Sequence, residues 1–336
     1  MEGAPKERTP MRPTDLEIAF GPVPSRRLGR SLGIDTIPPK TCSYACIYCQ
    51  LGPTLRMRID RCAFYDPGDV VAAVSARVAA IRQAGEAIDA LTFVPAGEPT
   101  LDVNLGREIL GLRPLGIPIA VITNASLIDQ EQVRLDLAGA DWVSLKIDTV
   151  DPHTWHVLDR PHRELRLERI LDGARAFARD FRGALVTETM LVEGVNDGER
   201  QLAAVAAFLA ELRPRTAYLS IPTRPPAVPT VRPPDEHTVN RAFQIFRERL
   251  PSVECLLGYE GSAFCSTGDV ERDLLSITAV HPMRDDAVRA LLARANADPD
   301  LLPRLLREGR LVETRYRGRR SYLRRVERAR KARSRR

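Results

Sequence analysis

The stretch Thr41–Gln50, TCSYACIYCQ, decides how the rest of the sequence is interpreted. It places Cys42, Cys46 and Cys49 in a C-x3-C-x2-C spacing, with Tyr48 directly before the last cysteine. Three thiolates this close together can bind three irons of a four-iron cluster, which leaves the fourth iron without a protein ligand. Half of a structural zinc site is the alternative, but such sites need four ligands, and no histidine or fourth cysteine lies nearby.

This motif resembles the signature of radical S-adenosylmethionine (SAM) enzymes. The words around it, GPVPSRRLGRSLGIDTIPPKTCSYACIYCQLG, resemble more narrowly a subgroup of iron–sulfur oxidoreductases related to the radical enzymes of wyosine tRNA-base synthesis. The resemblance extends from about Phe20 to the low 320s. It implies a [4Fe–4S] cluster on the three cysteines, SAM bound to the open iron, and reductive cleavage of SAM to a 5′-deoxyadenosyl radical. A ferredoxin or flavodoxin is then the expected electron donor.

Length and composition indicate a globular protein. The 336 residues allow one large and one small domain, and 44% of them are hydrophobic. No apolar run is long enough to span a membrane, and the N-terminus has no apolar signal region. We therefore expect a cytoplasmic protein without a membrane partner, in a compartment where thiols stay reduced.

The net charge of +6 is unevenly distributed. From Arg315 to the end, the sequence contains twelve basic residues and one acid, Glu327, whereas the preceding part is mildly acidic. A basic tail of this kind is either an arm that binds nucleic acid or a disordered extension that aids solubility.

The sequence predicts an α/β fold in which strands and helices alternate. Residues 1–17 are expected to be disordered, and residues 18–268 to form the main domain. Six strands are expected, at Ser31–Ile37, Ile88–Val94, Pro118–Thr123, Trp142–Ile147, Leu185–Leu191 and Ala217–Ile221. Alternation with helices favours parallel strands and right-handed crossovers. Six such units match the partial (β/α)6 TIM-like barrel that the resemblance implies.

Residues 269–323 have a different character. Three short helical patterns (269–277, 284–295 and 298–308) precede a two-stranded ribbon at Arg310–Tyr316 and Ser321–Leu323, which is the outline of a winged helix. Residues 324–336 are predicted to be a disordered basic tail. The candidates for phosphate contacts are Arg304, Arg307, Arg310, Arg317, Arg319 and Arg320. A protein-docking module is the alternative.

Polar residues follow several strands at the expected mouth of the barrel. Gly97-Glu98-Pro99-Thr100 follows strand two and could be an ordinary Gly-Pro turn. By resemblance it is the glycine–glutamate motif that receives the SAM amino group, with Ala96 in place of the first glycine. The predicted SAM contacts are Tyr48, Gly97, Glu98, Asn124, Ser144 and Asp148.

Two charged residues inside strands are candidate catalytic residues. Lys146 shares one face of strand four with Ser144 and Asp148, and it could pair with the SAM carboxylate, act on substrate, or neutralise Asp148. Glu188 lies within strand five, where a charge rarely serves packing. We expect Glu188 to point inward, the alternative being an outward salt bridge.

Candidates for substrate contacts are His153, Arg160 and Arg224, in loops expected at the same end of the barrel. His153, His156 and His162 lie close in sequence, but no spacing indicates a metal site. The remaining cysteines, Cys62, Cys255 and Cys265, could hold a second cluster or be buried apolar residues.

Three functions are compatible with these patterns. The first is a radical SAM enzyme that modifies RNA, suggested by the wyosine-related resemblance and the basic tail. The second is an activase that acts on a partner protein. The third is a nucleic-acid-binding redox sensor, which would have no need of a SAM site.

Overall fold

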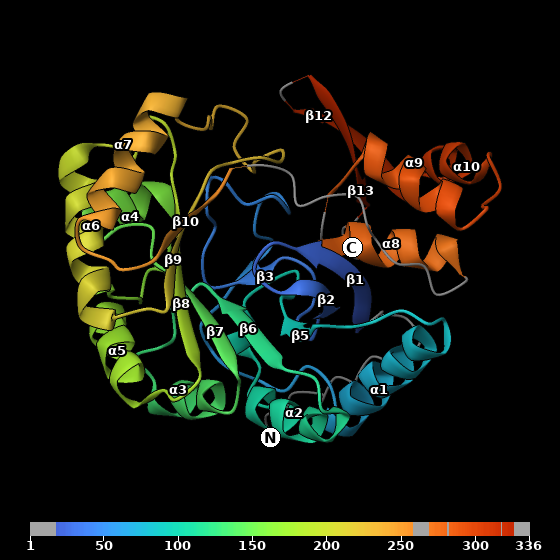
Figure 1. The fold of residues 1–336 in the computed structure, drawn as a ribbon, viewed down its shortest axis with the longest axis horizontal. Helices are drawn as coiled ribbons and strands as arrows, with labels where there is room; N and C mark the ends of the chain where they lie inside the picture. Colours follow the sequence, from blue (N-terminus) through green and yellow to red (C-terminus); the bar gives the residue numbers. More distant parts are fainter. Residues whose placement is uncertain (1–17, 258–268, 281, 317, 326–336) are drawn as a thin grey trace, which may run out of the picture.

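The computed structural model describes residues 18–257, 269–280, 282–316 and 318–325. Its main body is one eight-stranded sheet in the order β1-β2-β5-β6-β7-β8-β9-β10. The strands are β1 (Ala19–Ser25), β2 (Gly29–Ile34), β5 (Ala90–Phe93), β6 (Ile119–Thr123), β7 (Trp142–Lys146), β8 (Ala184–Met190), β9 (Thr216–Ser220) and β10 (Val253–Leu256). The sheet curls into a half-barrel with helices along its outer face (Figure 1). The predicted α/β partial barrel is thereby confirmed.

The six predicted strands correspond to β2 and β5 to β9, and they pair with one another in parallel. Two further strands extend the sheet. β1 pairs antiparallel with β2 and contains an irregularity between Phe20 and Val23. β10 pairs parallel with β9 at the other edge. β1 contains two prolines, which are tolerated because it is an edge strand.

Helices connect the strands and cover the convex face of the sheet (Figure 1). They are α1 (Pro67–Gln83), α2 (Leu105–Leu112), α3 (Glu131–Ala138), α4 (Pro152–Leu158), α5 (Leu167–Asp180), α6 (Glu199–Leu212) and α7 (Glu236–Arg247). Short 3-10 turns occur at η2 (Pro99–Leu101) and η3 (Arg113–Leu115). In α1, Asp66 caps the helix by accepting a hydrogen bond from the Gly68 N–H, and one apolar stripe is buried against the sheet.

The segment with the clustered histidines was expected to be a loop, but part of it is helical. Residues 152–158 form α4, because Asp151 accepts hydrogen bonds from the N–H and hydroxyl of Thr154 and Pro152 occupies the first turn. His153 and His156 are exposed on this helix. The sequence signal, Asp-Pro-x-Thr, was present but was overlooked.

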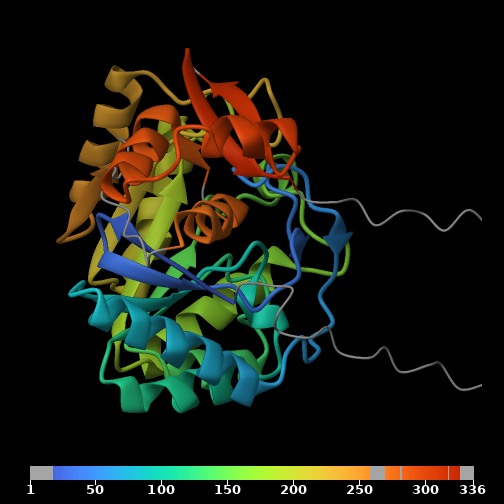
Figure 2. The same cartoon turned by 90° about the vertical axis from the view of Figure 1, so that its right-hand side faces the viewer.

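The C-terminal part forms a small module beside the open side of the half-barrel (Figure 2). It contains α8 (Val270–Val280), β11 (Met283–Arg284), α9 (Asp285–Arg294), α10 (Leu301–Arg307), β12 (Leu311–Tyr316) and β13 (Arg319–Arg324). Its three-stranded sheet has the order β11-β13-β12. The three predicted helices and the ribbon are all present.

The module is joined to the barrel by a shared apolar cluster and a buried ion pair. Phe20 and Val23 of β1 and Ala96 pack with the module's core. Asp273 is fully buried and lies 2.6 Å from the guanidinium of Arg77 in α1. α8 is therefore part of the barrel's wall and not a separate appendage.

Several predictions fall outside the described residues: the disordered segment 1–17, most of the basic tail, Arg317 and Cys265. Within the described part, no helix combines the length and apolarity needed to cross a membrane.

Candidate active site

The cluster cysteines follow the Pro-Pro turn after β2. Cys42 lies in β3 (Thr41–Cys42), and Cys46 and Cys49 lie in the loop beyond it. Residues 41–50 are called the cluster loop below. All three are free and partly exposed, and they line one cavity of about 370 Å³ at the carboxyl ends of the strands. The sequence prediction that these three cysteines share one site agrees with this geometry.

The surroundings of the cysteines suit iron ligands. Burial, followed by the charge of Glu98, raises the pKa of Cys42 to about 12, and burial also raises the pKa of Cys46 and Cys49. A buried thiolate therefore needs a cation beside it, which iron supplies. Asn124 Nδ2 donates a long hydrogen bond to Cys42 Sγ, at 3.5 Å. Such hydrogen bonds to sulfur are typical of cluster sites.

No three His, Cys, Asp or Glu side chains of the described residues converge on a point where they could hold one metal ion. This is compatible with cluster ligands, which each bind a different iron and need not converge.

Glu98 links the cluster loop to the end of β6. Its side chain is 1% exposed and lines the cavity. Oε1 accepts hydrogen bonds from the N–H and hydroxyl of Thr100 and from the hydroxyl of Thr123, while Oε2 accepts one from the Asn124 N–H at 2.8 Å. Oε1 is thus saturated, but Oε2 can accept a further donor. A ligand ammonium group in the cavity is such a donor.

Gly97 is required by close packing. A Cβ at this position would lie 2.0 Å from the Thr41 carbonyl oxygen, directly before the first cluster cysteine. The preceding residue, Ala96, departs from the expected double glycine. Its methyl group is buried in the apolar cluster shared with the C-terminal module, which explains the departure.

Lys146 and Glu188 form a charged centre in the cavity with Arg27, from the turn between β1 and β2. Glu188 lies 3.2 Å from Lys146 Nζ and 2.5 Å from Arg27 Nη1, and it accepts a hydrogen bond from Ser220 at 2.9 Å. Lys146 also lies 3.4 Å from Asp148. Glu188 points inward, as predicted.

The ion pairs keep both Glu188 and Lys146 ionised. Burial opposes ionisation of Glu188, but Lys146 and Arg27 outweigh it and lower the pKa to about 2. Burial likewise disfavours the Lys146 ammonium, but Asp148 and Glu188 raise its pKa above the ordinary value. At neutral pH, Lys146 is therefore a cation and Glu188 an anion. They can orient a substrate electrostatically, but neither is poised for general acid–base catalysis.

Tyr48 lines the cavity and is fixed from behind by two aspartates. Its hydroxyl donates to Asp148 and lies 3.1 Å from Asp159 Oδ1. Burial and then the charge of Asp148 raise the pKa of Asp159 well above its ordinary value. The Tyr48 hydroxyl is thus held between the two carboxyl groups, which fixes the ring at the wall of the cavity.

The structure brings only some of the predicted contact residues to the cavity. Tyr48, Gly97, Glu98 and Asn124 line it, as do Lys146 and Glu188. Ser144 and Asp148 are buried but do not line it, and Asp148 instead accepts a hydrogen bond from the Met190 N–H. Arg27 and Ser220 were missed. Arg27 lies in the hairpin turn before β2, so a search restricted to residues that follow the parallel strands could not find it.

Of the substrate candidates, only Arg224 lines the cavity, where it donates to Gln50 Oε1 at 2.7 Å. His153 is exposed on α4. Arg160 is exposed, and its carbonyl oxygen accepts a hydrogen bond from the Ala45 N–H on the cluster loop. Of the remaining cysteines, the two that the structure describes lie apart from each other. The backbone of Cys62 forms an isolated β-bridge with Asp102, which follows β5. Cys255 lies in β10, an edge strand of the main sheet.

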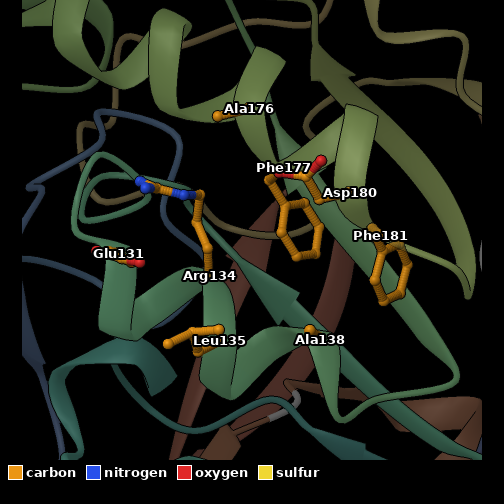
Figure 3. Close-up of a pocket in the computed structure, with 8 residues that line it drawn as sticks. All are labelled: Glu131, Arg134, Leu135, Ala138, Ala176, Phe177, Asp180 and Phe181. Carbon is orange, nitrogen blue, oxygen red and sulfur yellow. The ribbon is translucent and has the colours of Figure 1, made fainter.

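A smaller cavity of about 150 Å³ lies on the outer surface between α3 and α5 (Figure 3). It is lined by Glu131, Arg134, Leu135, Ala138, Ala176, Phe177, Asp180 and Phe181. It contains none of the predicted site residues, so the chemistry is assigned to the cavity with the cysteines.

A family model for the radical SAM superfamily matches residues 36–206. This chain belongs to the radical SAM superfamily. The resemblance carried by the cysteine motif is thereby confirmed, and the chain is a radical SAM enzyme. The family implies a [4Fe–4S] cluster and SAM, which the thiols, Glu98 and the cavity fit.

Individual proteins and solved structures are similar to this chain. A UPF0026 protein of Methanocaldococcus jannaschii is 43% identical over 313 residues, covering 93% of this chain and 97% of that protein. The solved structure of TYW1 with a lysine–pyruvate adduct bound is similar with a TM-score of 0.52 at 15% identity, over 66% of this chain and 74% of that one. A radical SAM methyltransferase from Sphaerobacter thermophilus is similar with a TM-score of 0.50 at 18% identity, over 70% of each chain. The two structures show a shared radical SAM fold.

Proposed function

We propose that this radical SAM enzyme binds a [4Fe–4S] cluster through Cys42, Cys46 and Cys49, cleaves SAM reductively beside it, and acts on an RNA base. The observation that carries the first part is that a single cavity is lined by the three cysteines, Glu98 and Asn124. The low-potential electron donor is a ferredoxin or flavodoxin.

When bound and reduced by one electron, the cluster and SAM supply a 5′-deoxyadenosyl radical. The chain's own residues determine where the ligands lie. Glu98 Oε2 would accept a hydrogen bond from the amino group of SAM, and the side chain of Asn124 supports Cys42. Leu51 and Val280 give the cavity apolar walls that exclude water.

Anaerobic reconstitution with iron and sulfide, followed by addition of dithionite and SAM, tests this part. We expect 5′-deoxyadenosine, detected by mass spectrometry, from the native protein and none from Cys46→Ala. A protein that assembles the cluster but neither binds nor cleaves SAM would contradict the proposal and favour the redox sensor.

We also propose that residues 269–325 are a winged helix that contacts RNA through its hairpin. The order of helix, short strand, two helices and hairpin supports this assignment. α10 carries little net positive charge outward, because Arg304 pairs with Glu271 and Arg307 pairs with Asp300. The hairpin is therefore the better candidate for RNA contact.

The hairpin of β12 and β13 carries exposed arginines and lies close to the cavity. Arg319 and Arg320 are exposed and make no ion pair with any described residue. Arg315 pairs with Glu313 at 3.4 Å and lies opposite Arg320 across the strands, so a phosphate would add a second anion beside these two cations. The Tyr316 hydroxyl donates to the carbonyl oxygen of Pro222, which lines the cavity, at 3.2 Å.

Filter binding of transfer RNA at several salt concentrations tests the substrate class. Arg319→Glu with Arg320→Glu should weaken binding and lower the slope of log K against log salt by about 1.4–1.8. Arg169→Glu with Arg200→Glu, which reverses two exposed charges on α5 and α6, is the matched control. Equal binding by the variant and the native protein would contradict the RNA proposal and favour the activase, which acts on a partner protein.

A further inference from the structure

A short strand covers the outside of the cluster loop. β4 (Arg56–Met57) pairs parallel with β3, and Met57 lies opposite Cys42. The N–H groups of Leu55 and Arg56 both donate to the Lys40 carbonyl oxygen, at 3.0 and 3.1 Å. The segment is thus held one strand away from a predicted cluster ligand, and the two strands lie at the margin of the molecule (Figure 2).

The outer surface of this segment is apolar and positively charged. Leu55 is 50% exposed and Met57 38% exposed, although both are large apolar side chains. Residues 53–58, PTLRMR, contain two arginines and no acid. Arg56 is exposed and makes no ion pair with any described residue. Exposed apolar side chains beside unpaired cations are typical of a surface that binds a partner.

A second cation lies against the same loop. The Arg160 carbonyl oxygen accepts a hydrogen bond from the Ala45 N–H at 3.2 Å, and Pro161 forms a bridge with Tyr44. The Arg160 side chain is exposed, again without an ion pair among the described residues. The outer side of the cluster loop therefore carries positive charge from two separate parts of the chain.

We infer that Leu55, Arg56, Met57 and Arg160 form the docking surface for an acidic one-electron carrier, of which flavodoxin is the test case. The inference rests on the proposed function, since it concerns how the cluster receives its electron. One electron leaves the flavin hydroquinone, which becomes the semiquinone, and enters the cluster; no proton or bond is exchanged with this chain.

The chemistry of the surface favours such a carrier over RNA. The apolar pair Leu55 and Met57 has no counterpart in a phosphate backbone but suits the apolar centre of a protein interface. Complementary charge around a small interface gives fast, transient association, as electron transfer requires. Met57, next in register to Cys42, provides a short path to the cluster.

Electron transfer from flavodoxin hydroquinone to the reconstituted protein tests the inference, with semiquinone formation followed by stopped-flow absorbance. Arg56→Glu with Met57→Glu should lower the second-order rate and the binding affinity at least tenfold. The control, Leu110→Glu with Arg169→Glu, places the same changes at exposed positions on α2 and α5 and should react like the native protein. Dithionite needs no docking surface and should reduce the cluster equally in all of them.

If the double variant does not bind iron, the more conservative variant Arg56→Gln is measured instead. It should react more slowly at low salt and show a weaker dependence of rate on salt than the native protein. Rates equal to those of the native protein would overturn the inference, as would loss of RNA binding with flavodoxin binding intact. A native protein that dithionite reduces but that forms no 5′-deoxyadenosine would instead refute the proposed function.

Discussion

At the scale of single residues, the cavity combines fixed charges that depend on one another. Lys146 is held between Asp148 and Glu188, and Glu188 between Lys146 and Arg27. Removing one member leaves its partners buried without compensation, which costs more than the intact pair contributes.

Lys146→Met should therefore lower the free energy of unfolding by about 3 kcal/mol or more. Urea denaturation at pH 7 measures this change. Lys146→Met combined with Asp148→Asn should recover part of the loss, because Glu188 keeps its ion pair with Arg27 and no carboxylate of this centre then lacks a cation. An unfolding midpoint of Lys146→Met equal to that of the native protein would show that the ion pairs contribute nothing.

A second buried acid lies outside the cavity. Glu108 in α2 is fully buried, and neither carboxyl oxygen has a hydrogen-bond partner among the described residues. Burial and then the charge of Asp102 raise its pKa to about 9. Between the ordinary pKa of 4.5 and about 9, the unfolded chain releases this proton while the folded chain keeps it. Stability therefore falls as pH rises through this interval.

Glu108→Gln removes this dependence. From pH 6 to pH 9 the native protein should lose on the order of 1–4 kcal/mol more than the variant. Chemical denaturation at both pH values measures the difference. Glu168→Gln, exposed in the first turn of α5, should behave like the native protein. Parallel pH profiles of Glu108→Gln and the native protein would show that Glu108 is ionised in the fold.

At the scale of elements, the site depends on how tightly the turn after β5 packs on the cluster loop. Gly97→Ala introduces a Cβ 2.0 Å from the Thr41 carbonyl oxygen. The clash is between two backbone segments, so it can be relieved only by moving the main chain of residue 97 or residue 41. The iron content after reconstitution should fall at least several-fold. Gly198→Ala, where a Cβ would meet only the flexible end of Gln201 at 3.3 Å, should load normally. Full loading of Gly97→Ala would show that the loop can move.

The sequence predicted the elements with strong local signals and missed those defined by tertiary pairing. The six parallel strands and the cysteine loop could be predicted from apolar runs and spacing. β1 could not, because its prolines oppose a strand and only its edge position permits them. Arg27 was missed for a related reason: its contact with Glu188 joins residues 161 positions apart. Ser144 and Asp148 share the predicted face of their strand, yet the neighbouring packing keeps them from the cavity.

At the scale of the whole molecule, the module and the barrel depend on a buried contact. Asp273→Ala removes the buried carboxylate that pairs with Arg77 and should cost about 3 kcal/mol. Hydrogen exchange, measured by mass spectrometry, should accelerate in α8 and β1, while iron content stays unchanged. Asp286→Ala removes an exposed pair with Arg284 and should change little. Unchanged exchange in Asp273→Ala would show that the apolar cluster alone holds the module.

Val280 at the end of α8 lines the same cavity as the three cysteines, so the module's first helix is also a wall of the cluster site. Reduced iron–sulfur clusters are destroyed by dissolved oxygen, and the rate depends on how freely oxygen reaches them. We therefore expect the module to slow the access of oxygen to a cluster bound there, whatever it binds on its outer face. A barrel that lost this helix would be an enzyme with a shorter lifetime in air.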